Sequence, residues 1–460
     1  MKKPYICAAA IIALNACVAP ARADPDIALC QITAPAQFGR VGEIGSGTIG
    51  VSFGTSHYNA GTAPLPWGSL PDNAHPLFTQ NMYRMGVVDG STRFEQIGMS
   101  WVFNSYCPLQ NATCAACTPS ELCGPALGPG CSTPHSAASS ASQSNLSSRG
   151  YVNPFTGVYP PSLNNHAGHS HNGISHRLQV DDDDLAFPGA VYVLESHAVT
   201  PHDSAAGNSF NNVGHRIVAV SGPSESGVFS FSPQGSTIQQ APAIYAWSSA
   251  THIEVNPSPG SDGRIIVAYE VSPLTAGLYH YEFAIYNMNN DAGVGAFAVP
   301  ATPCAEVTSA GFHAVRNHAP EANAPNYSSE PWQFLNADGL VRWSTEPYPL
   351  NPNANAIRWG TMYNFRFDAA GPPVPATATL TLFMTGVDVE VAIVGPGTPN
   401  ALRADFNGDC EVDVSDADAF IQILLGINSE ASDSIRADLD GSGTADGLDI
   451  SRFVSEMLGA

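Results

Sequence analysis

Residues 404–426 and 437–459 repeat one pattern, and this repeat constrains the chain more than any other feature of the sequence. Aligned without a gap, the two segments share their acidic positions, their apolar positions and a closing glycine. Side chains that carry oxygen stand at positions 1, 3, 5, 9 and 12 of a loop in both copies. Because Ca²⁺ prefers about six to eight oxygen ligands, a loop of about 12 residues with this spacing can wrap one ion. The repeat therefore predicts two bound Ca²⁺ ions.

The candidate ligands follow from the loop positions, with position 7 contributing its backbone carbonyl. In the first loop they are Asp405, Asn407, Asp409, Glu411, Asp413 and Asp416. In the second loop they are Asp438, Asp440, Ser442, Thr444, Asp446 and Asp449. The alternative is a solvated acidic tail, since runs of charge are usually solvated. A disordered tail would not repeat its apolar residues in register with its carboxylates, so we favour the calcium loops.

Each loop leads into a segment whose apolar residues have helical spacing. They are Phe420, Ile423, Leu424 and Ile427 in the first copy, and Ile450, Phe453, Val454, Met457 and Leu458 in the second. Gly426 and Gly459 stand where the end of a helix favours a positive φ. We therefore predict one helix after each loop.

Two positions depart from the standard EF-hand loop. Position 12 is Asp in both copies, where the standard loop has the longer Glu. Position 6 is Gly443 in the second loop but Cys410 in the first, and a side chain makes a left-handed backbone costly there. We expect the first loop to be strained but formed.

Two Asp-terminated loops in tandem, each followed by one helix, resemble a type I dockerin over residues 404–460. The resemblance implies docking to a cohesin-like or cell-surface partner, often with a polysaccharide-degrading enzyme as cargo. Residues 93–117, 177–185 and 351–369 also resemble a group of secreted bacterial proteins that often end in such tails. That second resemblance implies no activity.

The N-terminus predicts export. Lys2 and Lys3 precede an apolar stretch at residues 6–18, and residues 21–23 read Ala-Arg-Ala. This is the pattern of a secretory signal peptide cleaved after Ala23, and its apolar stretch is too short to span a membrane. A lipoprotein signal at Cys17 is the alternative. We predict a secreted or cell-surface protein without a transmembrane segment.

Composition excludes two functions. Lys2 and Lys3 are the only lysines, so the mature chain has none for Schiff-base chemistry. The formal net charge of −23 repels phosphate backbones, which excludes an ordinary nucleic-acid interface.

Eight cysteines follow the predicted signal peptide, namely Cys30, Cys107, Cys114, Cys117, Cys123, Cys131, Cys304 and Cys410. In an exported protein they are expected to form disulfides. The Cys-x-x-Cys motif at Cys114 and Cys117 leaves half a zinc site or a redox motif as alternatives. We favour a loop held together by disulfides, whose pairing the sequence does not give.

Strand signals dominate the rest of the chain. Alternation is clearest at residues 279–285, 357–367 and 387–393, which favours an antiparallel β-sandwich. The fold class is therefore mainly β: an N-terminal β-rich domain with an irregular disulfide-stapled insert, an antiparallel β-sandwich, and a small helical module. The predicted boundaries are 1–23 for the signal peptide, 24–256 for the β-rich domain, 257–394 for the sandwich, 395–403 for a linker and 404–460 for the repeat.

Two polar clusters of the body are candidate metal sites. His166, His169, His171 and His176 have the residue type that holds zinc or copper, with His197, His202 and Asp203 downstream. Their segment is glycine-rich, so we expect a solvated loop in preference to a metal site. Residues 181–184 are four consecutive aspartates, which we expect to form a solvated turn in preference to a third calcium site.

The enzyme hypothesis rests on carboxylates and the binding hypothesis on tryptophans. Glycoside hydrolysis needs two carboxylates about 5–10 Å apart, and the candidates are Glu195, Glu270, Glu282, Asp368 and Glu390. We expect Glu282 and Glu390 to face solvent. Trp67 and Trp332 are the candidate sugar platforms, whereas Trp343 and Trp359 are expected in the core. Since no short catalytic motif is present, we favour a non-catalytic body, with a polysaccharide hydrolase or a carbohydrate-binding protein as alternatives.

Overall fold

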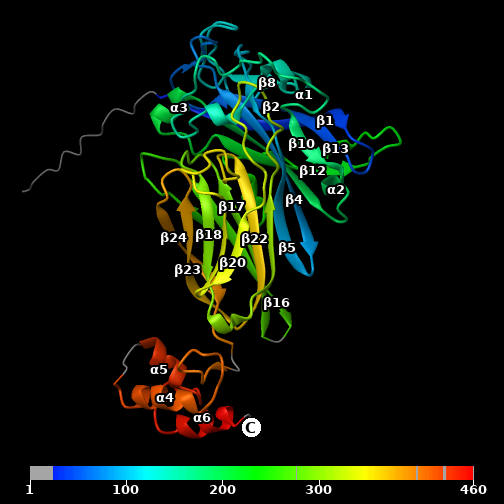
Figure 1. Cartoon of the computed structure of the whole chain (residues 1–460). Helices are drawn as coiled ribbons and strands as arrows, with labels where there is room; N and C mark the ends of the chain where they lie inside the picture. Colours follow the sequence, from blue (N-terminus) through cyan, green and yellow to red (C-terminus); the bar gives the residue numbers. More distant parts are fainter. Residues whose placement is uncertain (1–23, 276, 400–401, 428–430, 459–460) are drawn as a thin grey trace, which may run out of the picture.

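The computed structural model describes residues 24–275, 277–399, 402–427 and 431–458. The predicted signal peptide at residues 1–23 and Gly459 lie outside the described residues. Figure 1 shows a large β-rich body and a small helical module beyond one end of it. The described part of the chain contains no helix with the length and hydropathy that crossing a bilayer requires.

Two antiparallel sheets form the N-terminal half of the body. In sheet I the strands lie in the order β1 (Ile27–Val41), β2 (Thr48–Asn59) and β10 (Leu178–Asp181). Strand β8 (Ser132–His135) also pairs with β2. Sheet II orders β13 (Ser230–Pro233), β12 (Val213–Ser221), β11 (Val191–Val199), β4 (Leu77–Val88), β6 (Val102–Asn104) and β9 (Leu146–Ser147), with β5 (Ser91–Met99) on β4 and β14 (Ile238–Gln239) on β12.

Two further antiparallel sheets form the sandwich. Sheet III orders β15 (Thr251–Val255), β16 (Ile265–Thr275), β17 (Leu278–Asn287), β22 (Thr361–Ala370) and β19 (Thr308–Ala314). Sheet IV orders β20 (Gln333–Ala337), β21 (Leu340–Ser344), β18 (Val294–Pro300), β23 (Pro373–Leu382) and β24 (Asp388–Pro396). Phe283 of sheet III and Phe297 of sheet IV lie 5.3 Å apart between ring centroids in the shared core. The predicted fold class is confirmed.

The four sheets stack in the order I, II, III, IV. Phe53 and Leu194 belong to one buried cluster between sheets I and II, and Val193 and Ala284 belong to another between sheets II and III. Sheets II and III are therefore covered on both faces. This explains why the central strands β4, β11 and β17 are buried almost continuously, whereas the outer strand β23 alternates.

Because sheet III is covered on both faces, the prediction that Glu282 faces solvent is wrong. Glu282 on β17 was expected to face solvent, but it is 1% exposed because sheet II packs over that face. Its carboxylate accepts a hydrogen bond from Arg93 Nε at 3.1 Å and lies 3.3 Å from His280 Nε2. Asp368 on β22 lies 2.6 Å from the other ring nitrogen of His280. Glu390 is exposed, as predicted.

The insert between sheets is irregular and held by disulfides, as predicted. Its short elements include β7 (Ala126–Leu127), α1 (Ala137–Ser140), η1 (Gln143–Asn145) and η2 (Arg149–Tyr151). Other short elements of this half lie outside the insert: β3 (Leu65–Pro66), α2 (Asp182–Leu185), α3 (Pro201–Ala206) and η3 (Ala243–Ala246). The disulfides are Cys30–Cys114, Cys107–Cys123 and Cys117–Cys131. Because the Cys-x-x-Cys cysteines each pair elsewhere, they offer neither a zinc ligand nor a redox pair.

The C-terminal module contains η6 (Val414–Asp416), α4 (Ala417–Leu424), α5 (Ala431–Ala437) and α6 (Asp449–Met457). Helices α4 and α6 follow the two loops as predicted, and Gly426 has the expected positive φ of 66°. Helix α5 lies between the repeats and was not predicted from the sequence. Stacked rings of Phe406, Phe420 and Phe453 form the module's core.

Candidate functional site

The two loops of the module share one hydrogen-bonding scaffold around position 12. Asp416 and Asp449 are fully buried. Oδ1 of each accepts the backbone N–H of position 3, at 3.0 Å from Asn407 and 3.0 Å from Asp440. Oδ2 of each accepts the N–H of position 9, at 3.0 Å in the first loop and 2.8 Å in the second. A carboxylate of Asp length at position 12 thus closes both loops.

Position 1 plays an equivalent part in both loops. Oδ2 of Asp405 accepts the N–H of Cys410 at 3.0 Å, and Oδ2 of Asp438 accepts the N–H of Gly443 at 2.8 Å. Both position 6 residues have left-handed backbones, with φ of 71° for Cys410 and 92° for Gly443. The left-handed conformation expected at Cys410 is therefore present in a formed loop.

The second loop brings three predicted ligands together. Ligand oxygens of Asp438, Asp440 and Asp449 lie within 4.8 Å of one another. The hydroxyl of Ser442 donates to the carbonyl oxygen of Thr444 at 3.2 Å, beside them. Burial raises the pKa of the Asp438 carboxyl, but N–H groups of residues 441–443 outweigh it and hold that pKa below its usual value. The carboxylate of Asp446 accepts the N–H of Leu448 at 2.8 Å.

The first loop is arranged differently around its position 1. Asp405 groups with the sulfurs of Cys304 and Cys410, and Asn407 Nδ2 donates to Asp409 Oδ2 at 2.9 Å. Asp409 Oδ1 accepts the N–H of Glu411 at 2.9 Å.

Position 9 of the first loop also caps the short helix η6, which leads into α4. Asp413 Oδ1 accepts the N–H of Ser415 at 2.7 Å, and hydrogen bonds from Ser415 lower the pKa of the Asp413 carboxyl. One carboxylate thus serves the loop and caps the helix.

A disulfide joins the first loop to the body. Cys410, at position 6, pairs with Cys304 in η4 (Pro303–Ala305), which lies between β18 and β19 of the sandwich. The sequence predicted disulfides but not this partner. The module is therefore attached to the body twice, through the chain that follows β24 and through the disulfide.

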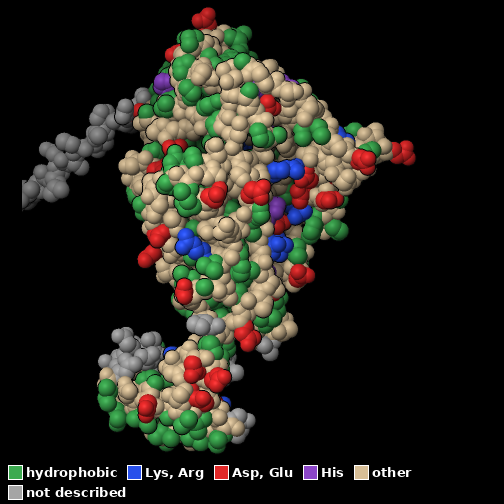
Figure 2. Space-filling model, in the orientation of Figure 1, with side chains coloured by type: hydrophobic (Ala, Val, Ile, Leu, Met, Phe, Trp, Pro, Cys, Tyr) green, Lys and Arg blue, Asp and Glu red, His purple; other side chains and the backbone are tan. Residues whose placement is uncertain are grey.

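Apolar side chains are exposed at equivalent positions of the two repeats. Ile421 and Leu425 in the first repeat correspond to Val454 and Leu458 in the second, and Leu425 and Leu458 are 68% and 70% exposed. The predicted apolar stripes thus divide between a buried core and an outward surface. Figure 2 shows hydrophobic side chains gathered along the edge of the module that faces away from the body.

The family model described as the dockerin type I domain matches residues 403–458. The match confirms the resemblance for the C-terminal module, whose class implies docking to a cohesin-type partner and calcium binding. Proteins that carry such a domain are typically extracellular or on the cell surface.

Comparisons of the whole chain add little. A comparison with curated proteins finds no match. Among solved structures, a serine-rich repeat protein (Srr2) from Streptococcus agalactiae is 9% identical, over 81% of this chain and 92% of that chain, with a TM-score of 0.20. A TM-score this low does not establish a shared fold.

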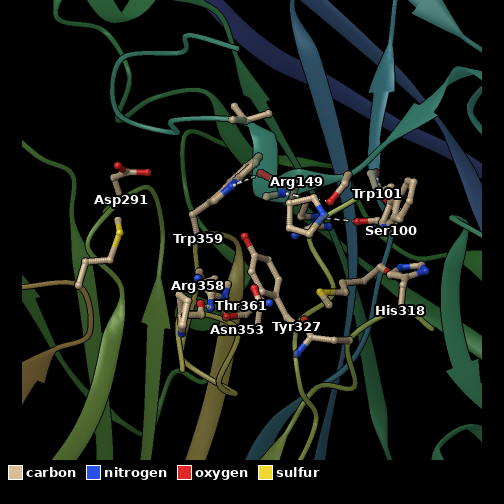
Figure 3. Close-up of a pocket in the computed structure, with 18 of the residues that line it drawn as sticks. Ser100, Trp101, Arg149, Asp291, His318, Tyr327, Asn353, Arg358, Trp359 and Thr361 are labelled. Atoms are coloured by element: carbon tan, nitrogen blue, oxygen red, sulfur yellow. Dashed lines mark hydrogen bonds between the residues drawn. The ribbon is translucent and has the colours of Figure 1, made fainter. Parts of the chain in front are cut away.

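The body contains a cavity of about 310 Å³. Trp101 and Trp359 line it, and the guanidinium carbon of Arg358 lies 3.6 Å from the ring centroid of Tyr327 (Figure 3). Asp291 is the only carboxylate among the described lining residues, and burial, followed by the charge of Asp262, raises its pKa. A single carboxylate does not provide the pair that glycoside hydrolysis requires.

Arg149 forms a wall of this cavity and ties sheet II to the sandwich. The side chain is 7% exposed, and burial lowers the pKa of its guanidinium to about 10. Nε and Nη1 donate to the carbonyl oxygens of Ser100 and Gly360 at 2.6 and 3.1 Å. Nη2 donates to Asn81 Oδ1 at 2.8 Å, and Asn81 Nδ2 in turn donates to Glu195 Oε1 at 2.9 Å. Sequence analysis did not single out Arg149, because its partners lie far away in the chain.

The tryptophan predictions are partly wrong. Trp67 and Trp332 were expected as exposed sugar platforms, but they are 1% and 5% exposed. Trp67 Nε1 donates to the carbonyl of Ser105 at 2.7 Å, and Trp332 packs against Phe312. Both rings are buried by residues distant in sequence, which the local sequence could not indicate. Trp343 and Trp359 lie in the core, as predicted.

The aspartates at 181–184 do not form a simple solvated turn. Asp182 is buried against Arg40 at 2.5 Å, and Asp184 pairs with Arg84 at 2.9 Å. Asp181 pairs with an arginine, Arg316, at 2.5 Å. Arginines therefore relieve the like-charge repulsion. Of the downstream residues, Asp203 is buried and accepts the N–H of Ile27 at 2.9 Å, and burial raises its pKa to about 7.

The histidine segment also differs from the prediction of a solvated loop. Of its four histidines only His171 is exposed, and His176 is buried. His197 is buried elsewhere in sheet II, and burial lowers its pKa to about 3. The loop folds back because His176 stacks on Trp101, with ring centroids 3.8 Å apart.

Proposed function

We propose that this chain is an exported protein that binds two Ca²⁺ ions through the twelve ligands named above and uses its C-terminal module to attach to a cohesin-like partner. The observation that carries the proposal is the duplicated scaffold, in which positions 1 and 12 hold equivalent backbone N–H groups in both loops. Such a scaffold preorganises carboxylate oxygens around each ion.

The docking surface of the proposal is the exposed apolar set on the two repeats, namely Ile421, Leu425, Val454 and Leu458. These side chains occur at matching positions of the two repeats. The phenylalanines that directly precede Ile421 and Val454 are instead buried in the module's core. Exposed apolar residues that persist in both copies favour a protein partner, because burying them on docking removes apolar surface from water.

Calcium and docking are tested together on the full exported chain. We expect calorimetric titration of the calcium-free protein to give two Ca²⁺ per chain and Asp449→Asn to give one. Asp418→Asn, an exposed aspartate of α4 outside the loops, is the control and keeps two. Capture by a panel of immobilised cohesin domains is expected with Ca²⁺ and lost with chelator. Leu425→Asp with Leu458→Asp should abolish capture while two ions still bind.

The outcomes separate the two parts of the proposal. A titration that gives no Ca²⁺ binding overturns the calcium sites. Normal Ca²⁺ binding without capture by any cohesin domain, or capture that the paired Leu→Asp variant retains, overturns the docking surface.

We propose further that the body does not catalyse polysaccharide hydrolysis. The support is the placement of the candidate carboxylates. Glu195 and Glu282 are buried in polar networks between sheets, Glu282 and Asp368 both contact the ring of His280, and Glu390 is exposed on an outer strand. We expect no reducing-sugar release from a panel of polysaccharides. Release that disappears in Glu282→Gln or Asp291→Asn would establish the hydrolase alternative.

A further inference from the structure

Four histidine rings converge at one point on the body, outside the calcium module. The ligand nitrogens of His166, His169, His171 and His176 all lie within 4.8 Å of one another. Nδ1 of His166 and Nε2 of His171 are 3.2 Å apart. Buried polar groups are normally satisfied by a protein group, an ordered water or an ion, so the partners of these ring nitrogens matter.

Neighbouring groups leave inward-facing nitrogens free to act as ligands. His166 Nε2 lies 2.8 Å from Asn164 Oδ1, an acceptor, so this nitrogen carries the proton and Nδ1 faces the cluster with its lone pair. His176 Nδ1 lies 3.4 Å from the carbonyl oxygen of Gln143, which leaves Nε2 facing the cluster. These outer acceptors fix the tautomers that a metal needs.

Unpartnered buried nitrogens mark the centre of the cluster. Within the described part of the chain, both ring nitrogens of His169 and Nε2 of His176 are buried and have no hydrogen-bond partner. Buried polar atoms normally have a partner, so these nitrogens mark a place for a ligand.

The loop is held in shape by groups around it. Oδ1 of Asn172 accepts the N–H groups of Ile174 and Ser175 at 2.9 and 3.0 Å. His176 has a left-handed backbone with φ of 65° and stacks on Trp101. A second segment closes over the loop, since Glu321 Oε2 accepts the N–H of Ser170 at 3.3 Å. Strain at a non-glycine residue is typical of functional positions.

We propose that His166, His169, His171 and His176 form a binding site for one divalent transition-metal ion, with Zn²⁺ as the ion that fits best. Zn²⁺ accepts four ligands in a tetrahedron at about 2.0–2.1 Å from each imidazole nitrogen. Such a shell places the nitrogens about 3.4 Å apart. In the cluster, His166 Nδ1 and His171 Nε2 are 3.2 Å apart, and all four ligand nitrogens lie within 4.8 Å of one another. Glu321 Oε1, 3.6 Å from His176 Nε2, is the facing carboxylate and neutralises part of the ion's charge.

Four protein ligands fill the zinc shell, so the site holds its ion without leaving a position for substrate. The ion would hold together the loop at 166–176, whose His176 stacks on Trp101 of the body cavity and whose Ser170 N–H donates to Glu321. The site is independent of the calcium loops, which offer oxygen ligands that suit a hard cation.

The test titrates Zn²⁺ into the full exported chain, purified without a polyhistidine tag and kept in excess Ca²⁺ so that the carboxylate loops are occupied. We expect one Zn²⁺ per chain. His171→Gln and His169→Gln should each weaken binding by at least the ~100-fold that loss of a supporting hydrogen-bond partner can cost. His202→Gln, which alters a half-buried histidine of α3, is the matched control and should bind as the wild type does.

Two further measurements keep the test decisive. Because the His171 ring is exposed, His171→Gln should melt at the wild-type temperature without zinc, and only the wild type should gain stability on adding Zn²⁺. Co²⁺ in the same site should give the intense visible absorption of tetrahedral coordination. No binding at micromolar Zn²⁺, zinc binding that both ligand variants retain, or the weak absorption of octahedral Co²⁺ would overturn the proposal.

Discussion

Replacing Arg149 with alanine is expected to lower the free energy of unfolding of the body by about 3–5 kcal/mol, because each buried acceptor left unsatisfied costs about 1–3 kcal/mol. The substitution leaves the carbonyls of Ser100 and Gly360 without this donor and removes the cation that faces Glu195 through Asn81. It also removes the guanidinium that lies 5.7 Å from the Trp359 ring. The loss of stability is large because the Arg149 guanidinium joins sheet II to the sandwich.

Denaturant unfolding measures this change as a shift of the midpoint at constant slope. Arg149→Lys should fall between wild type and Arg149→Ala, because an ammonium keeps the charge but lacks the planar fork that reaches several carbonyls. Arg342→Ala is the control, since Arg342 is exposed on β21 and its loss should change stability by no more than about 0.5 kcal/mol. Equal shifts for Arg149→Ala and Arg342→Ala would contradict the prediction.

Removing the Cys304–Cys410 disulfide is expected to destabilise the C-terminal module by about 3 kcal/mol. When the module unfolds and the body stays folded, the disulfide closes a loop that runs only from the end of β24 to Cys410. A loop of about 15 residues accounts for a stabilisation of this size through the entropy of the unfolded chain. Calorimetry of Cys304→Ser with Cys410→Ser, in excess Ca²⁺, should show the module's transition at lower temperature.

A glycine at the same position separates the two roles of Cys410. Cys304→Ser with Cys410→Gly also lacks the disulfide, but glycine adopts φ near 71° without the roughly 1–2 kcal/mol that a side chain costs there. We therefore expect this variant to recover about that amount over the serine variant. Cys107→Ser with Cys123→Ser removes a disulfide of the insert and should leave the module's transition unchanged. A module transition that does not move in either Cys304 variant would contradict the prediction.

The module could be predicted from the sequence because its interactions are local. Every hydrogen bond of the loop scaffold joins residues within one repeat, so the spacing of Asp405, Asn407 and Asp416 already contains the geometry. Helix α5 was missed because it carries little apolar periodicity, and the partner of Cys410 was missed because Cys304 lies 106 residues away.

The body was harder to predict because sheets far apart in sequence cover one another. Alternation on β17 correctly identified a strand, but alternation could not indicate that sheet II would bury Glu282 on the opposite face. The same reason applies to Trp67 and to the histidines, whose surroundings depend on Ser105, Trp101 and Glu321. Periodicity identifies elements, whereas burial depends on which other elements cover them.

The disulfide at Cys410 also determines how mechanical load would pass through the protein. If the module holds a surface partner while flow pulls on the body, tension enters the first calcium loop and reaches the body at Cys304, between β18 and β19. Because the disulfide offers this second route, the force need not pass through β24, which lies at the edge of sheet IV. The disulfide thus directs force to β18, in the middle of sheet IV, and to β19, at the edge of sheet III.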